Sequence, residues 1–264
     1  MKYFCPNSFD DYFAISEQDF TLFAGGTDLI PRYERGQKLP KNIIDLKKLP
    51  DFIRINKVGD NIAIGAGTTI EEIKNSNLIK KHFNALWLTT TEFGSVQIRN
   101  RATIGGNICN ASPAGDTLPA LYAFNAKLLL RSKYGERTVP IDEFILGPGK
   151  TTIKDRETLQ VVMVPLSSSN SMFYKLGLRE AMAISVINFA IVFDENELTI
   201  ALGAVAPTII KLTGLKELNI DQILEKVDSA ISPIDDIRAT ALYRRKALQN
   251  MLRFELSKII NNVR

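Results

Sequence analysis

Two pairs of adjacent glycines are the residues of this 264-residue chain whose spacing points most directly to chemistry. Gly25 and Gly26 follow an apolar run in LFAGGTDLI, and Gly105 and Gly106 lie within RATIGGNICNASPAGD. Glycine lets the backbone turn through positive φ and lets a ligand approach the main-chain N–H groups, so either pair could hold a phosphate without a charged side chain. An isolated pair can also be no more than a tight turn.

Neither pair belongs to a common nucleotide-binding motif. The stretch GAG at 65–67 would need a glycine three residues further on to complete G-x-G-x-x-G, but Ile70 stands there. The spacing therefore excludes the Rossmann and P-loop motifs.

Together, the two glycine pairs indicate more than either does alone. Two such loops could close on a pyrophosphate from two sides, with main-chain N–H groups and the side chains of Thr27, Thr103 and Asn107 as donors. Asp116, just beyond the second pair, could accept a hydrogen bond from a ribose hydroxyl. The pattern favours a dinucleotide cofactor over a mononucleotide.

Composition excludes several other chemistries. With only Cys5, Cys109 and His82, this chain alone cannot form a zinc or iron–sulfur site, and no motif for a nucleophilic triad surrounds His82. The net charge of +4 comes from 33 basic and 29 acidic residues without basic blocks, which argues against nucleic acid as a partner. MKYFCPNSFDDYF lacks the apolar core of a signal peptide, and no later stretch has the roughly 18 apolar residues of a membrane span, so we expect a cytoplasmic protein.

The elements that must position the first glycine pair form a compact βαβ unit. DFTLF reads as a strand that ends on the glycines, TDLIPRYERG as a short helix that Gly36 closes, and NIIDLKKL as a second strand. A hairpin around VGDN then leads into a helix capped by Thr68 or Thr69. NLIKKHFNALWLTTTEF has helical spacing, whereas QIRNRATIGGNICNASPAGD shows turn residues and no helical period, so the second pair is expected in a loop.

The second half of the chain is rich in strands. AKLLLRS, RTVPI and TLQVVMVPL predict strands, and SSSN at 167–170 is the best candidate for a linker. Three further strands follow in SMFYKLGL, SVINFAIVF and ELTIALGAVA, and then two helices, the second from about residue 237 to the end. The fold class is α+β, with a two-part N-terminal region and a smaller C-terminal domain of sheet plus helices.

Four segments carry a resemblance to a known family. LFAGGTDLIP, QIRNRATIGGNICNASPAGDTLPAL, GPGKTTI and DDIRATALYRRKAL, in this order, resemble the FAD-binding medium subunit of molybdenum hydroxylases, the group of the xanthine dehydrogenase FAD-binding subunit and the carbon monoxide dehydrogenase medium subunit. The resemblance covers essentially the whole chain. It implies an FAD-binding domain of the vanillyl-alcohol-oxidase (PCMH) type over 1–166, divided into 1–50 and 51–166, and a C-terminal domain of the carbon monoxide dehydrogenase flavoprotein type over 171–264.

The resemblance also implies cofactor contacts at particular positions. Asp116 matches a position on the adenosine side, and Phe93 matches an aromatic beside the isoalloxazine, although ordinary packing is the alternative reading for Phe93 and Tyr174. These two are candidates for gating the flavin face, and no residue is expected to act as acid, base or nucleophile. The complete implied set is Leu22, Phe23, Ala24, Gly25, Gly26, Thr27, Asp28, Phe93, Ala102, Thr103, Ile104, Gly105, Gly106, Asn107, Asp116, Thr158, Leu159, Tyr174 and Lys175.

The remaining arginines have structural interpretations. We expect Arg99, Arg101 and the neighbours Arg179 and Glu180 to form salt bridges or partner contacts. Arg244 and the adjacent Arg245 should lie on the solvated side of the last helix.

In the family that the chain resembles, a large subunit oxidises the substrate at a molybdopterin cofactor and a small subunit carries two [2Fe-2S] clusters. FAD then delivers the electrons to NAD or another acceptor. The resemblance therefore implies a flavin module without its own substrate site, and leaves open whether the complex oxidises a purine, carbon monoxide, nicotinate or an aldehyde. Two alternatives are a self-contained flavoenzyme of the same fold and a binding protein that has lost flavin.

Overall fold

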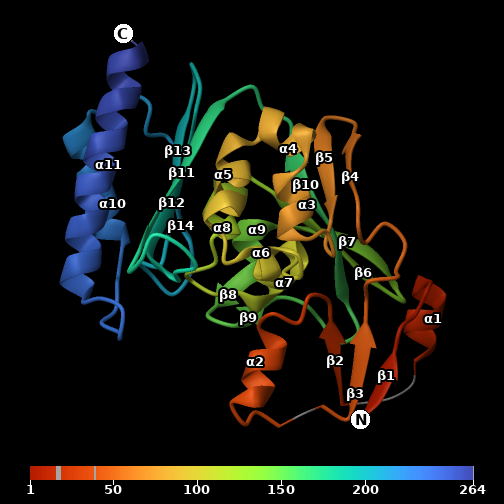
Figure 1. Ribbon diagram of the computed structural model, residues 1–264. Coiled ribbons are helices and arrows are strands. Elements are labelled where there is room, and N and C mark those ends of the chain that lie inside the picture. Colours follow the sequence, from red (N-terminus) through yellow and green to blue (C-terminus); the bar gives the residue numbers. More distant parts are fainter. Residues whose placement is uncertain (16–18, 39, 264) are drawn as a thin grey trace.

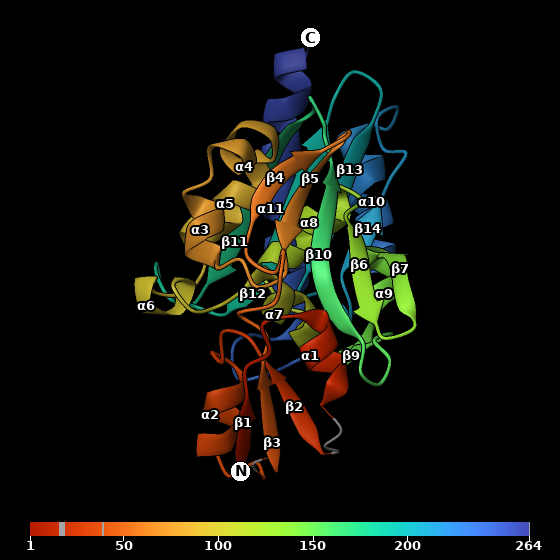
Figure 2. The same ribbon diagram turned by 90° about the vertical axis from the view of Figure 1, so that its right-hand side faces the viewer.

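The computed structural model describes residues 1–15, 19–38 and 40–263. A small parallel sheet lies at the bottom of Figure 1, a five-stranded sheet with its helices lies above it, and a four-stranded sheet covered by two long helices lies to the left. Figure 2 shows the small N-terminal sheet standing below the rest of the molecule. The mixture of helices and sheets agrees with the predicted α+β class.

The N-terminal part is the predicted βαβ unit with one additional strand and helix. β2 and β3 pair in parallel, and β1 adds on the far side of β3, which gives the order β1-β3-β2. β2 ends at Phe23, one residue before the glycine pair. The side chain of Ser8 caps α1 by accepting a hydrogen bond from the N–H of Asp11. The elements are β1 (Lys2–Phe4), α1 (Phe9–Ala14), β2 (Phe20–Phe23), α2 (Leu29–Glu34) and β3 (Asn42–Asp45).

The second part is built on an antiparallel sheet in the order β4-β5-β10-β6-β7. Its strands are β4 (Ile55–Val58), β5 (Asn61–Gly65), β6 (Lys127–Ser132), β7 (Gly135–Pro140) and β10 (Thr158–Pro165), with the small hairpin β8 (Ile145–Gly147) and β9 (Lys150–Thr151). Its helices are α3 (Ile70–Lys74), α4 (Asn77–His82), α5 (Asn84–Glu92), α6 (Val96–Arg99), α7 (Ile104–Asn110), α8 (Thr117–Ala123) and α9 (Ile141–Phe144). Thr69, one of the two predicted caps, begins α3 in a capping box with Glu72.

The prediction of an irregular loop at the second glycine pair is wrong, because two short helices occupy this stretch. The side chains of Ser95 and Thr103 cap α6 and α7. The start of α7 packs on the end of β5, where the N–H of Gly105 donates to the carbonyl of Ala66 at 2.8 Å. Two glycines weaken helix propensity, but tertiary packing outweighs propensity in short helices.

The C-terminal part is an antiparallel sheet in the order β11-β12-β13-β14. Its elements are β11 (Asn170–Gly177), β12 (Ser185–Phe193), β13 (Leu198–Gly203), β14 (Ile210–Leu212), α10 (Ile220–Ala230) and α11 (Ala241–Val263). α10 and α11 cover one face of this sheet, whereas α5 and α8 cover the other (Figure 1). α11 begins four residues later than predicted, since Ile237 lies outside the helix and is 100% exposed.

Two hydrophobic cores meet at this sheet. Phe173, Ala190 and Ala201 point from it into the core shared with the first two parts of the chain, and Ile187, Phe189 and Ile191 point toward α10 and α11. The alternation of side chains along a strand divides the apolar residues between the two cores. The predicted linker at 167–170 lies between β10 and β11, except that its last residue, Asn170, begins β11. The division into two domains stays a prediction. None of the described helices has the length and apolarity needed to cross a bilayer.

Candidate cofactor-binding site

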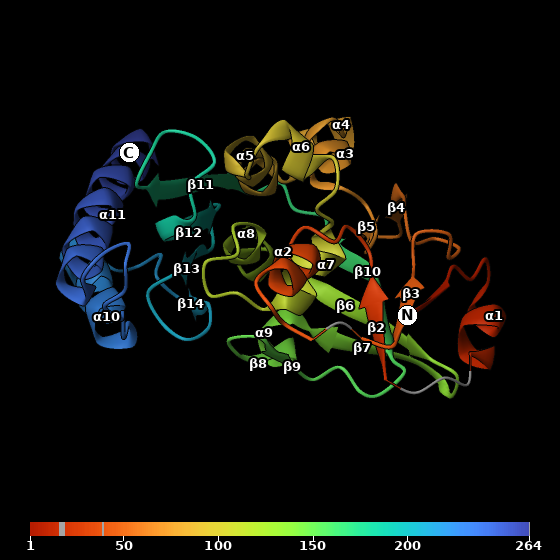
Figure 3. The ribbon, with the colours of Figure 1, turned by 60° about the horizontal axis from the view of Figure 1, so that its bottom comes forward.

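A cavity of about 510 Å³ lies between the small N-terminal sheet and the second part of the fold. Figure 3 shows α2 beside α7, the two helices that follow the first glycine pair and contain the second. The volume is in the range of small-molecule and cofactor sites. Its lining residues are Leu22, Phe23, Ala24, Gly25, Gly26, Thr27, Asp28, Leu29, Leu46, Phe52, Ala66, Phe93, Ile98, Ala102, Thr103, Gly105, Gly106, Asn107, Cys109, Asn110, Ile153, Thr158 and Leu159.

The first glycine pair supplies free main-chain donors to this cavity. Gly26 turns the chain at φ +75°, and a β-carbon there would lie 2.6 Å from the ring of Phe23. Within the part of the chain that the structure describes, the N–H groups of Gly25, Gly26 and Thr27 have no hydrogen-bond acceptor. Successive N–H groups at a turn form an anion-binding concavity, so this segment can receive a phosphate.

The second glycine pair has a different role from the one predicted for it. The N–H of Gly105 is taken by Ala66, and the N–H of Gly106 donates to Oγ1 of Thr103 at 3.0 Å. A β-carbon on Gly105 would lie 2.6 Å from that of Ala66, so this glycine allows close packing of α7 on β5. Gly106 is exposed and leaves the cavity wall without a side chain. The second glycine pair therefore shapes the wall rather than supplying main-chain N–H donors.

Asn107 remains a side-chain donor in this second segment. Its Oδ1 accepts a hydrogen bond from Oγ1 of Thr117 at 2.6 Å, which orients the amide. Among the described residues, no acceptor faces its Nδ2 group, and the residue lines the cavity. Its amide N–H groups can therefore bind an acceptor on a ligand.

The rest of the cavity is mainly apolar. Phe52, Phe93 and Ile98 contribute large side chains, and Thr158 and Leu159 come from β10 just before a register shift in its pairing with β6. Burial raises the pKa of the Cys109 thiol to about 12, so this lining residue is an unreactive thiol at neutral pH. Such walls suit a flat aromatic group.

The lining carries one formal charge among the described residues. Asp28 is an acid, and its carboxylate forms an ion pair with the Arg32 guanidinium at 2.6 Å. No lysine or arginine lines the cavity in the described part of the chain, so its anion-binding capacity rests on backbone N–H groups.

Four predicted contact residues do not line the cavity. Ile104, the first residue of α7, is fully buried. Asp116 is 8% exposed, and its carboxylate accepts hydrogen bonds from Lys175 Nζ at 2.6 Å, Ser185 Oγ at 2.6 Å and Asn188 Nδ2 at 3.0 Å. Lys175 Nζ also donates to the carbonyl of Glu92 at 2.9 Å, one residue before Phe93. The pair thus borders the cavity, and direct contact with a cofactor stays a prediction.

Tyr174 points away from the cavity. Its hydroxyl donates to Oε2 of Glu255 on α11 at 2.6 Å, and its ring lies 5.2 Å from that of Phe189. Burial and Glu255 raise the pKa of this hydroxyl. Because neighbouring residues on a strand face opposite sides, Tyr174 faces α11 when Lys175 faces Asp116. In the structure Tyr174 therefore packs against α11 and does not line the cavity, and its role as a gate of the flavin face stays a prediction.

The predicted structural arginines divide into two groups. Arg99 forms the expected salt bridge, with Nε 2.7 Å from Oε2 of Glu71. Arg244, expected in solvent, is 2% exposed and donates to Asp236 at 2.7 Å and to the carbonyl groups of Val186 and Ala204. The prediction of a solvated Arg244 is wrong because the loop before α11 folds back over its guanidinium.

Several lining residues were missed from the sequence, and they are Leu29, Leu46, Phe52, Ala66, Ile98, Cys109, Asn110 and Ile153. GAG at 65–67 contained a signal for two of them. β-Carbons on Gly65 and Gly67 would lie within 2.5 Å of Phe52, so these glycines let Phe52 pack onto β5 beside Ala66. The motif failed as a nucleotide signature but marked a close approach of two segments.

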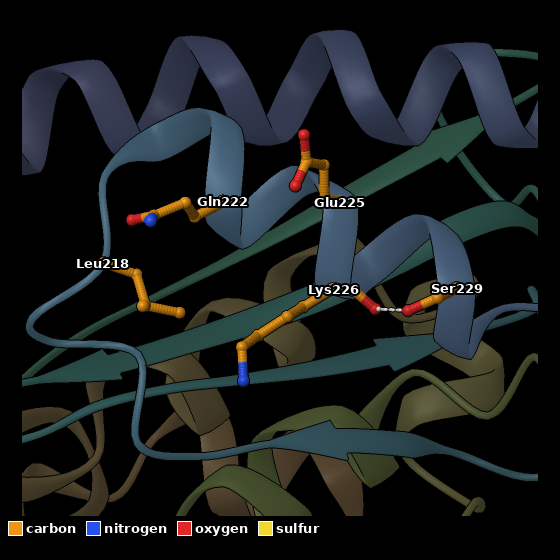
Figure 4. A pocket seen from close by; sticks show the side chains of 5 residues that line it. All are labelled: Leu218, Gln222, Glu225, Lys226 and Ser229. Atoms are coloured by element: carbon orange, nitrogen blue, oxygen red, sulfur yellow. Dashed lines mark hydrogen bonds between the residues drawn. The ribbon is translucent and has the colours of Figure 1, made fainter.

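A second depression lies on α10 and is drawn in Figure 4. Gln222 is engaged in the capping box of α10, and Ser229 Oγ donates to the carbonyl of Lys226 at 2.9 Å. Glu225 and Lys226 point in opposite directions (Figure 4). The polar groups do not converge, so this depression is no candidate site. In the described residues, no three His, Cys, Asp or Glu side chains gather where they could hold a metal ion.

Free backbone donors at a glycine turn, next to an apolar cavity between two subdomains, define a protein built to bind an anionic cofactor with an aromatic ring system. Family comparisons make this specific. Residues 1–167 match the model of the FAD binding domain in molybdopterin dehydrogenase, and residues 172–258 match that of the CO dehydrogenase flavoprotein C-terminal domain. The chain belongs to this family of FAD-binding medium subunits of molybdenum hydroxylases, and it is an oxidoreductase subunit.

Individual relatives agree with this assignment. The xanthine dehydrogenase FAD-binding subunit of Escherichia coli O157:H7 is 30% identical over 257 residues, which cover 90% of this chain and 88% of the relative. The nicotinate dehydrogenase FAD-subunit of Eubacterium barkeri is 37% identical over 171 residues, 63% of this chain and 58% of the relative. Among solved structures, carbon monoxide dehydrogenase of Hydrogenophaga pseudoflava matches with a TM-score of 0.88 at 26% identity, covering 96% of this chain and 94% of the other.

Proposed function

We propose that this chain holds FAD in the cavity, with the pyrophosphate at the Gly25–Gly26 turn. The observation that carries the proposal is the set of N–H groups of Gly25, Gly26 and Thr27 without acceptors in the described residues, at a cavity that no lysine or arginine lines. Backbone donors can balance a diphosphate where cations are absent. Asn107 would add a side-chain donor from the opposite wall.

The residues proposed to contact FAD are those predicted positions that line the cavity. They are Leu22, Phe23, Ala24, Gly25, Gly26, Thr27, Asp28, Phe93, Ala102, Thr103, Gly105, Gly106, Asn107, Thr158 and Leu159. Asp116 and Lys175 are proposed as neighbours that hold the end of α5 and thereby place Phe93. This supporting role is inferred from the ion pair between Asp116 and Lys175 and from the hydrogen bond that Lys175 donates to the Glu92 carbonyl, next to Phe93.

When bound, FAD would supply the ability to accept electrons singly and to release them as a pair. The chain's own residues bind and orient the cofactor and exclude water through the apolar wall at Phe52, Phe93 and Ile98. The described lining residues include one carboxylate, Asp28, which is ion-paired with Arg32, and they include no histidine, lysine or arginine. The proposed role is therefore electron transfer without acid–base catalysis by this subunit.

The proposed partners are a large molybdopterin subunit and a small subunit with two [2Fe-2S] clusters, and the proposed acceptor is NAD or another oxidant. The identity of the Escherichia coli relative as an FAD-binding subunit supports a multi-subunit assembly. The relatives are named for xanthine, nicotinate and carbon monoxide, which supports a substrate site outside the medium subunit.

The test uses the purified full-length chain. A flavin absorption spectrum, with the cofactor released and identified as FAD, is the expected result. Co-purification with a molybdenum subunit and a two-cluster subunit separates the proposal from its alternative, a self-contained flavoenzyme. A chain that takes up no FAD from solution would contradict the proposed site.

A further inference from the structure

Arg32 on α2 joins the two walls of the cofactor cavity. Its Nε lies 2.6 Å from Oδ2 of Asp28, and its Nη2 donates to Oδ1 of Asn110 at 2.6 Å. Asp28 comes just before α2, and Asn110 is the last residue of α7. Both partners line the cavity. One side chain therefore binds a residue of each glycine-bearing segment.

This bridge lies on one side of the N-terminal part, and other contacts hold the opposite side. There, the Arg131 guanidinium lies 4.0 Å from the ring centroid of Phe9, and the Arg156 guanidinium lies 5.2 Å from that of Phe20. Among the described residues, the bond from Arg32 to Asn110 is the one hydrogen bond between α2 and α7. Loss of this bond would leave the contacts on the α1 side and the packing of Gly25 on Arg101, and would loosen α2 from α7.

A bound cofactor would contact both segments, because residues 22–29 form one wall and 102–110 the other. Separation of the two walls would weaken both sets of contacts together. The planar guanidinium can donate in two directions at once, which suits it to hold two acceptors in fixed relation. The side chain is 43% exposed, and bonds at that exposure add little to global stability.

We propose that Arg32 is a clasp that retains the cofactor by holding α2 against α7. The inference rests on the proposed function and deepens it, since it assigns retention of FAD to a residue outside the cavity lining. The effect is expected on the rate of cofactor release, because the bridge must open before the walls separate. The rate at which FAD binds to the apo chain should change little, because FAD enters a cavity whose walls are already apart.

The experiment dilutes the FAD-loaded chain into an excess of an apo-flavoenzyme that captures released FAD, and measures the release rate by the activity that this enzyme regains. Arg32→Ala and Asn110→Ala should each release FAD roughly threefold to tenfold faster than the wild type, and the double variant should be no faster than the single ones. Arg35→Ala is the matched control. It removes an equal charge next to the same helix, where the guanidinium bonds, among the described residues, only to the carbonyl of Pro31.

The release rates distinguish a clasp from a general effect of charge or stability. Equal release from Arg32→Ala and Arg35→Ala would overturn the clasp, and so would additive effects of Arg32→Ala and Asn110→Ala, since independent contacts add. The midpoint of thermal unfolding of the apo variants should match that of the apo wild type, whereas general destabilisation would lower this midpoint. A wild-type chain without FAD would instead overturn the proposed function, and the clasp with it.

Discussion

The main chain of Gly25 lies directly against the carbonyl oxygen of Arg101, so closely that a β-carbon on Gly25 would be 1.9 Å from that oxygen. This contact brings the first glycine segment to the residue that precedes the second one. The carbonyl oxygen of Arg101 belongs to the backbone, so it cannot rotate aside as a side chain could. The cavity therefore depends on the absence of a side chain at Gly25 before any ligand arrives.

Gly25→Ala is expected to displace the first segment and abolish FAD binding. The added methyl group meets fixed backbone, and overpacking of this kind costs roughly 1–3 kcal/mol or more. Flavin content of the purified variant, with its thermal midpoint, checks both effects. Gly214→Ala is a useful comparison, because its β-carbon would meet nothing within 4 Å and any loss there comes from its positive φ alone. Full flavin retention by Gly25→Ala would show that this contact does not limit binding.

Gly106→Val should leave the fold intact and weaken FAD binding. A β-carbon at this exposed position would approach only Oγ1 of Thr103, at 2.9 Å, while its methyl groups would project into the cavity. Loss of a close wall contact should lower affinity by tenfold or more, about 1.4 kcal/mol. Titration of the apo chain with FAD measures this. The matched control is Gly147→Val, at a position outside the cavity lining with nothing within 4 Å, which should bind normally.

Tyr174→Phe should reduce stability without affecting the flavin. The variant loses the hydrogen bond to Glu255, which is 5% exposed and keeps its contact with Lys258, at a cost of about 1–2 kcal/mol. Chemical unfolding gives the loss, and the flavin spectrum and affinity should match the wild type. A shifted flavin spectrum would instead place Tyr174 at the site.

Lys175→Met, on the opposite face of β11, is expected to change the flavin absorption spectrum, because Lys175 holds the carbonyl of Glu92 next to Phe93.

Asp236 should make the C-terminal part sensitive to acid. Burial opposes its ionisation, but the N–H groups of Arg238 and Ala239 and the Arg244 guanidinium outweigh this and lower its pKa from 3.8 to about 2. A carboxylate with a depressed pKa stabilises the fold above its ordinary pKa, and this contribution is lost as the pH falls from about 4 toward 2.

The measurement for this prediction is a difference between variants. Asp236→Asn should be roughly 3 kcal/mol less stable than the wild type at pH 6, because Arg244 loses its buried partner, and the gap should narrow below pH 4. Asp228→Asn removes the exposed pair with Arg245 and serves as control, with little change at either pH. A gap that stays constant down to pH 2 would contradict the assignment.

Local pattern was enough to predict much of this fold. The βαβ unit before Asp45, the hairpin around Gly59 and the three long strands after 170 follow from apolar alternation and turn residues, which act over a few residues. The helix cap at Thr68 or Thr69 was predicted in the same way, and Thr69 forms it. The helix at Gly105 escaped prediction, because its stability comes from packing on Ala66, nearly 40 residues earlier.

The sequence by itself determined the family and the two glycine segments, because both reside in short ordered motifs. Only the tertiary structure decided which segment offers free main-chain N–H groups to a ligand and which one shapes the cavity wall. The N–H groups at Gly25 and Gly26 are free because no acceptor folds over them in the described chain, whereas those at Gly105 and Gly106 are taken by Ala66 and Thr103. The side to which Tyr174 turns and the bridge from Arg32 were likewise set by partners far away in the chain, which local sequence does not encode.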